Sequence, residues 1–199
     1  TQGNGGGVCA GKKSKITMRS GLITENTSVV AAGGMVAQGV GTTLEMTGGA
    51  ITKNVAETSG GGLNCSKVDF RMSGGEIAGN TASQAGGVFI TTRMEMSGGA
   101  VRDNVAKTDG GGVRNAWGTT VELTGGAITG NTAQRYGGGV YCMGSFLQSG
   151  GEVSGNSTST GGGAVATRSG ASVELAGGVM NGNSAANGGA VYIAPESAC

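Results

Sequence analysis

Apolar and polar residues alternate along this chain in short segments that are separated by glycine. Residues 44–49 read Leu-Glu-Met-Thr-Gly-Gly, and residues 94–99 read Met-Glu-Met-Ser-Gly-Gly. Alternation with a period of two is typical of β-strands with one buried face, and no window has the spacing of an amphipathic helix. The pattern therefore predicts an all-β protein whose strands turn at glycine.

This pattern repeats along the whole chain. Glycine-rich clusters begin near positions 5, 32, 60, 85, 110, 137, 161 and 188, so each unit spans 24 to 28 residues. Each unit holds three alternating segments. Such a unit cannot bury its own apolar face, but units stacked about 4.8 Å apart close a continuous core. We expect a single domain over residues 1–199: a single-stranded right-handed parallel β-helix of about eight coils, each of roughly 26 residues with three short strands.

Three columns of apolar residues are expected to point into this core. The first column contains Val8, Leu63, Val88, Val113, Val140, Val165 and Val191. The second contains Ile16, Met18, Leu44, Met46, Phe70, Met72, Met94, Met96, Val121, Leu123, Val173 and Leu175. The third contains Ile23, Ile51, Ile77, Val101, Ile128, Val153 and Met180.

An asparagine follows the third column in every unit. The set is Asn26, Asn54, Asn80, Asn104, Asn131, Asn156 and Asn183. Asparagine tolerates left-handed turn geometry better than most residues, and stacked carboxamides can bond to the coils above and below. We expect an inward-facing Asn ladder with a structural role.

Two of these repeats carry a recognisable motif, Gly49-Ala50-Ile51 with Asn54 and Gly126-Ala127-Ile128 with Asn131. The motif resembles the repeats of bacterial surface β-helix proteins, and is similar to those of the chlamydial polymorphic outer-membrane adhesins and related surface proteins of gut bacteria. The adhesin motif usually has Phe where this chain has Ile or Val. The resemblance implies a β-helix on the cell surface or outside the cell.

Composition narrows the possible functions. The chain has 13 Lys and Arg against 12 Asp and Glu, so no net charge favours nucleic acid. No apolar run is long enough for a membrane span, so we expect no membrane insertion. The absence of His removes the commonest general base and metal ligand. We therefore expect no catalysis, cofactor or metal. The main alternative to a structural role is glycoside hydrolysis by a carboxylate pair at Glu95 and Glu122, but these residues lie among Arg71 and Arg93.

A partial stripe of aromatic residues is expected on the outward side of the first strand. It consists of Phe89, Arg114, Tyr141 and Tyr192. Aromatic residues mark interfaces, so the stripe could form a lateral contact or stack on a sugar ring. A glycan or a host receptor is a possible partner. Ice binding is a weaker alternative, since Arg102 and Asn181 interrupt the outward Thr column.

The sequence shows no capping element at either end of the stack, where strand edges would remain unpaired. A non-closing head-to-tail contact generates a filament. We therefore expect an extracellular or cell-surface filament subunit that stacks on itself. The alternative is an adhesin or stalk segment of a larger bacterial surface protein.

The four cysteines support specific expectations. Cys65 and Cys142 follow the first apolar column by two residues, which predicts inward-facing free thiols about three coils apart. Cys9 is expected to face outward in the first coil, and Cys199 lies in the last one. These two cannot meet within one chain, but could form an intermolecular disulfide between stacked subunits. Unpaired surface thiols are the alternative.

Overall fold

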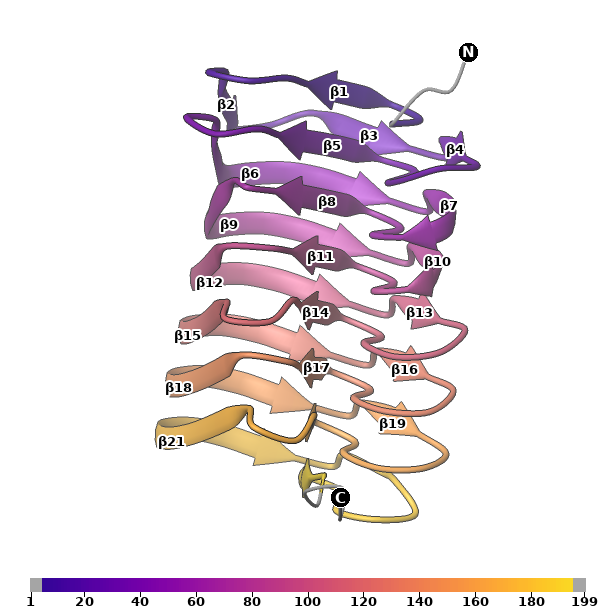
Figure 1. The fold of residues 1–199 in the computed structure, drawn as a ribbon, viewed down its shortest axis with the longest axis vertical. Helices are drawn as coiled ribbons and strands as arrows, with labels where there is room; N and C mark the ends of the chain where they lie inside the picture. The colour runs from indigo at the N-terminus through magenta and orange to yellow at the C-terminus, as the bar shows by residue number, and fades with distance from the viewer. Residues whose placement is uncertain (1–4, 195–199) are drawn as a thin grey trace.

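The computed structural model describes residues 5–194 and is a right-handed parallel β-helix (Figure 1). Every named element in this part of the chain is a β-strand, and the strands form three parallel sheets. The chain makes about seven turns, and β22 is the first strand of an eighth. The predicted all-β solenoid with a repeat of about 26 residues is confirmed.

The first sheet takes one short strand from each coil. In spatial order its strands are β1 (Val8–Ala10), β5 (Met35–Gln38), β8 (Leu63–Ser66), β11 (Val88–Ile90), β14 (Val113–Asn115), β17 (Val140–Cys142), β20 (Val165–Thr167) and β22 (Val191–Ile193). Inward and outward residues alternate, so Val88 and Ile90 are buried while Phe89 between them is half-buried. In the second coil, Met35 takes the inward position of this column. The predicted column did not include it.

The second sheet contains long strands that join two of the segments expected as separate strands. Its members are β2 (Lys15–Met18), β3 (Leu22–Thr24), β6 (Thr43–Thr52), β9 (Asp69–Ala78), β12 (Arg93–Arg102), β15 (Thr120–Thr129), β18 (Ser145–Ser154) and β21 (Ser172–Asn181). The glycine pair makes a bulge where the register shifts instead of a turn. Only β2 and β3 of the first coil remain two strands.

The third sheet lies after the Asn corner, where the sequence analysis expected no strand. Its strands are β4 (Thr27–Ser28), β7 (Val55–Ser59), β10 (Thr81–Gln84), β13 (Val105–Ala106), β16 (Thr132–Ala133) and β19 (Ser157–Thr158). Most are only two residues long, too short to show alternation. Over residues 5–194, the second to sixth coils thus have three strands each, as predicted, but with different boundaries, whereas the first coil has four and the seventh has two.

The core is a continuous stack of the predicted columns. Val88, Val113, Val140 and Val165 are each fully buried. In the sixth coil, where no residue was assigned to the second column, Phe146 and Gln148 occupy it. Because each apolar side chain contacts equivalents in the coils above and below, burial is a property of the stack and not of one coil.

Glycine is required at the bulge for two different reasons. A Cβ on Gly98 would lie 2.4 Å from the carbonyl oxygen of Ser73 in the preceding coil. Gly99 has a φ of 79°, in the left-handed region that other residues rarely adopt. The bulge therefore depends on close backbone approach at one position and on backbone conformation at the next.

Candidate functional site

The Asn column forms the predicted ladder at the corner after the long strands. The backbone N–H of Asn104 donates to Oδ1 of Asn131 at 3.0 Å, and Nδ2 donates to the same oxygen at 2.9 Å. A second N–H of that amide donates to the carbonyl of Ile77, also at 2.9 Å. The same bonds connect all seven Asn residues, so the ladder is confirmed.

The left-handed residue at this corner precedes the Asn, contrary to our expectation. Glu25, Lys53 and Asp103 have φ of 59°, 55° and 55°, and the other coils have Gly at this position. This placement leaves the Asn free to turn its carboxamide inward. The expected turn geometry was correct for the corner but wrong by one residue.

The ladder has a direction. From Asn54 onward, each Oδ1 accepts from the Asn of the coil nearer the N-terminus, so the Asn-to-Asn bonds all run one way, while the second Nδ2 hydrogen donates back to a backbone carbonyl of the preceding coil. Among residues 5–194, no group donates to Oδ1 of Asn26, and the backbone N–H of Asn183 has no acceptor. The first described coil therefore ends in a free acceptor and the last in a free donor.

The two end faces of the described stack expose residues that are buried in the middle coils. Leu175 is 54% exposed, whereas Leu123 in the same column is fully buried. At the other end, Val8 is 36% exposed, whereas Leu63 in the same column is fully buried. The end faces also differ in charge. The first coil contains Lys12, Lys13, Lys15, Arg19 and Glu25 and is net positive, whereas the last complete coil contains Arg168 and Glu174 and has no net charge.

A stack of aromatic rings and one guanidinium runs along the outer face of the first sheet. The guanidinium carbon of Arg114 lies 5.4 Å from the ring centroid of Phe89 and 5.9 Å from that of Tyr141. Both distances are within the range of a cation–π contact. The structure thus places three of the predicted contact residues side by side on β11, β14 and β17.

Tyr136 completes this stack and was not predicted. Its ring lies 6.3 Å from Tyr141 and 5.8 Å from Tyr192, centroid to centroid, which bridges the coil where the outward residue is Ala166. Gly161 leaves space for the Tyr192 ring. The available signal was an aromatic residue directly before the Gly137 cluster, but no local pattern says that its ring reaches a neighbouring coil.

Arg114 and its neighbours form a small cationic surface beside these rings. Nη2 of Arg114 contacts Sδ of Met143 at 3.3 Å, and its buried Nε has no partner. Burial lowers the pKa of Arg114; the nearby Asp109 and Tyr141 oppose this shift, and the charge of Arg168 adds to it. Arg168 itself lies 5.0 Å from the ring centroid of Trp117. We call Arg114, Trp117, Tyr141, Met143 and Arg168 the arginine–aromatic surface.

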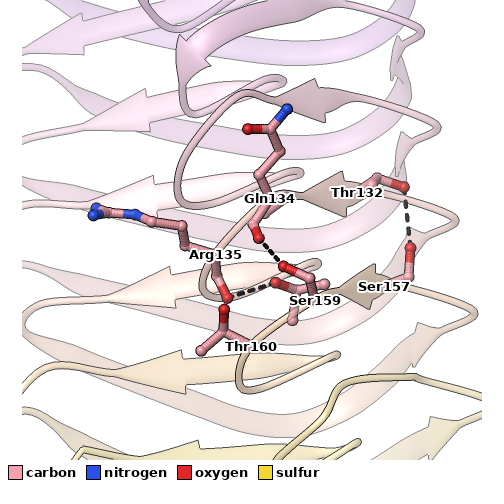
Figure 2. A pocket seen from close by; sticks show the side chains of 8 residues that line it. Thr132, Gln134, Arg135, Ser157, Ser159 and Thr160 are labelled. Atoms are coloured by element: carbon pink, nitrogen blue, oxygen red, sulfur yellow. Dashed lines mark hydrogen bonds between the residues drawn. The ribbon is translucent and has the colours of Figure 1, made fainter.

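A shallow polar depression of about 630 Å³ lies over β16 and β19 (Figure 2). Most of its hydroxyl groups are already used: Thr132 bonds to Ser157 at 3.2 Å, and Ser159 donates to the carbonyl of Gln134. The guanidinium of Arg135 bonds to Asp109 at 2.7 Å, which raises the pKa of Arg135. The depression therefore offers few free polar groups to a ligand.

The candidate carboxylate pair lies in a row of ion pairs. Glu95 and Glu122 are register neighbours on β12 and β15. Arg93 lies between them, 3.7 Å from the Glu95 carboxylate and 2.6 Å from that of Glu122. Arg71 adds a contact to Glu95 at 3.3 Å. This geometry is cross-strand charge pairing on a solvent-facing sheet.

Three of the four cysteines lie in the described part of the chain, and all three are free thiols. Cys65 and Cys142 are buried, as predicted, and burial raises the pKa of both. Cys9 is exposed on β1, also as predicted. Cys199 lies outside the described residues, so the intermolecular disulfide remains a prediction.

The described residues contain neither a cluster of metal ligands nor a membrane-spanning helix. Over residues 5–194 there is no group of three or more His, Cys, Asp or Glu side chains placed to hold a metal ion. The same part of the chain contains no helix that could span a membrane.

Comparison with known proteins does not assign this chain to a family. No protein-family model matches it. Searches of curated proteins and of solved structures also find no match. The functional argument therefore depends on the geometry of the coils themselves.

Proposed function

We propose that this protein is a rigid structural rod, extracellular or on the cell surface, that stacks head to tail into a filament. The observation that carries the proposal is the direction of the Asn ladder. A second copy stacked with the same polarity would bring the free acceptor of Asn26 to the free donors of Asn183. Head-to-head contact would oppose two acceptors, and leaving buried amide groups unpaired is costly.

The end faces complement each other in packing and in charge. In the long-strand sheet, Leu175 follows Leu123 and Gln148 in its column, and Met18 begins the same column in the first coil. Stacking would cover the exposed Leu175 with Met18 of the next copy. Lys15 and Arg19 would approach Glu174, which favours the same polarity.

Complete stacking requires one strand to move. The first sheet has one level more than the long-strand sheet, because β22 begins an eighth coil. If β2 and β3 of a second copy pair with β21, then β1 of that copy reaches the level that β22 occupies. Tyr192 anchors β22 by stacking on Tyr136, whereas Cys9 of β1 is exposed. We expect β1 of the incoming copy to leave its place in the sheet, which would release Cys9 for a bond to Cys199 of the neighbour.

Electron microscopy of the purified chain tests the proposal, with Leu175→Asp as the disrupting variant. We expect long fibres from the natural sequence and short rods from the variant, because the substitution places a charge in the junction and leaves the middle coils intact. Val105→Asp is the matched control, since Val105 is 41% exposed on a lateral face. Short rods from the natural sequence, or equal effects of both variants, would refute head-to-tail assembly.

A non-reducing gel tests the covalent link separately. We expect a ladder of multimers that collapses to one band on reduction and is absent from Cys9→Ser. Fibres without such a ladder would support the filament proposal and contradict the disulfide.

The second candidate function is an adhesin or stalk segment of a larger bacterial surface protein, as the repeat resemblance implies. The arginine–aromatic surface is the observation that favours it, because exposed aromatic and Arg side chains are enriched at contact sites. Short rods attached to other domains in native material would support this candidate.

A further inference from the structure

The arginine–aromatic surface contains two cations without a carboxylate partner. Arg71, Arg93, Arg102 and Arg135 each form an ion pair. Among residues 5–194, Arg114 and Arg168 form none; they lie on the same face, Arg114 on β14 and Arg168 directly after β20, two coils further along. Within the described part of the chain, four of the seven arginines are thus neutralised, and of the three that are not, Arg19, Arg114 and Arg168, only Arg114 and Arg168 lie over aromatic rings.

Arg114 is held in one orientation before any ligand arrives. The rings of Phe89 and Tyr141 enclose its guanidinium from both sides. Its only hydrogen-bond partner in the described structure is a thioether sulfur, which is a weak acceptor. A guanidinium has five N–H donors in a rigid fork that fits an anionic group. Binding an anion would therefore cost little side-chain ordering and would satisfy donors that are now unpaired.

The neighbouring groups indicate what the anion is attached to. Trp117 is 57% exposed beside Arg168, and the ring stack continues through Tyr136 to Tyr192 over about 19 Å, four coil spacings. The backbone groups of this sheet already bond between coils, so a peptide would find no strand edge to extend. Recognition must use ring surfaces, hydroxyls and guanidinium N–H groups, a set that fits an extended chain of sugar rings with acidic substituents.

We propose that the arginine–aromatic surface binds an acidic polysaccharide, with Arg114 and Arg168 holding its carboxylate or sulfate groups. The inference does not depend on filament formation, because these residues lie on the lateral face of the middle and later coils. A filament would present the surface once per subunit, and linked weak sites would then act together on one polymer.

Fluorescence of Trp117, the only tryptophan of the chain, provides the test. Polygalacturonate, heparin and neutral dextran are titrated into the purified protein. We expect saturable binding of one or both acidic polymers, weakening with added salt, and none of dextran. A preference for polygalacturonate or heparin identifies the carboxylate or the sulfate as the group that is bound.

Matched variants locate the site. Arg114→Gln and Arg168→Gln should each weaken binding on the order of tenfold, through loss of charge-assisted hydrogen bonds. Lys53→Gln, which removes one positive charge from the Asn corner of the second coil, should change the affinity less than about twofold, because three coils or about 14 Å separate it from β14, more than the screening length. Arg168 is exposed, so its substitution tests the site even if Arg114→Gln perturbs packing.

Three outcomes would overturn the proposal. The first is no binding of either acidic polymer. The second is equal weakening by Lys53→Gln, which would indicate nonspecific charge attraction. The third is equal or tighter binding of polyglutamate, which would indicate an acidic peptide as the partner.

Discussion

The Asn corner and the outer face of the first sheet run along the same coils but follow opposite rules. The corner carries Asn in every coil, and each is bonded to the next. The outer face carries a different side chain at nearly every level: Cys9, Val36, Asn64, Phe89, Arg114, Tyr141, Ala166 and Tyr192. The comparison teaches that the repeating positions hold the solenoid together, whereas recognition is left to those varied positions that are partly exposed, such as Phe89, Arg114 and Tyr141, and not to Val36 and Ala166, which are buried.

Replacing an Asn in the middle of the ladder should have the largest effect. Asn131→Ala removes the bonds to Asn104 and Asn156 and leaves buried amides unpaired. We expect the free energy of unfolding to fall by about 3 kcal/mol, measured by urea denaturation. Arg114→Gln on the outer face should change it by less than about 1 kcal/mol. Similar losses from both variants would contradict the division between the two regions.

The glycine bulge should be nearly as sensitive as the ladder, because it also repeats. Gly98→Ala brings a methyl group against the Ser73 carbonyl oxygen. We expect the free energy of unfolding to fall by about 2 kcal/mol through local overpacking, again measured by urea denaturation. Gly118→Ala is the control, since a Cβ there meets nothing within 4 Å, although its φ of 67° adds a smaller strain. A smaller loss at Gly98 than at Gly118 would refute the argument from close approach.

The two sides of the first sheet should differ in their pH dependence. Burial raises the pKa of Cys65, so the folded state keeps this proton while the unfolded chain loses it above about pH 8.5. The unfolded state then binds fewer protons, and stability falls as pH rises. Between pH 8 and 9.5 we expect the contribution of this thiol to lower the free energy of unfolding by about 1 kcal/mol.

Urea denaturation across that range compares Cys65→Ala, which should flatten the decline, with Cys9→Ala on the exposed side, which should not. An unchanged slope in Cys65→Ala would show that other groups cause the decline. Cys142 should contribute in the same direction, because burial also raises its pKa.

The smallest expected effect is a gain in stability. Lys53 has a φ of 55° at the corner where other coils have Gly, and its side chain is exposed. Lys53→Gly should raise the free energy of unfolding by about 0.5 kcal/mol, since relief of left-handed strain slightly exceeds the added chain entropy. Thermal denaturation would detect it. The control Lys107→Gly, at a position not in the left-handed region, should be neutral or destabilising.

The candidate site could be predicted only in part. The alternation along each strand placed Phe89, Arg114, Tyr141 and Tyr192 in one outward column, and the structure confirms that alignment. Tyr136, Trp117 and Arg168 were missed because they lie in turns, where no period defines direction. The third sheet was missed for a similar reason, since most of its strands have only two residues.

The sequence by itself determined the solenoid, its period, its inward columns and its Asn corner. These follow from a pattern that repeats once per coil, and stacking then pairs each residue with its equivalent. The tertiary structure alone decided where the pattern is broken: which arginines find a carboxylate, which rings meet, and which way the ladder points. Those features depend on contacts between side chains of different coils, and local alternation carries no information about how far a side chain in a turn will reach.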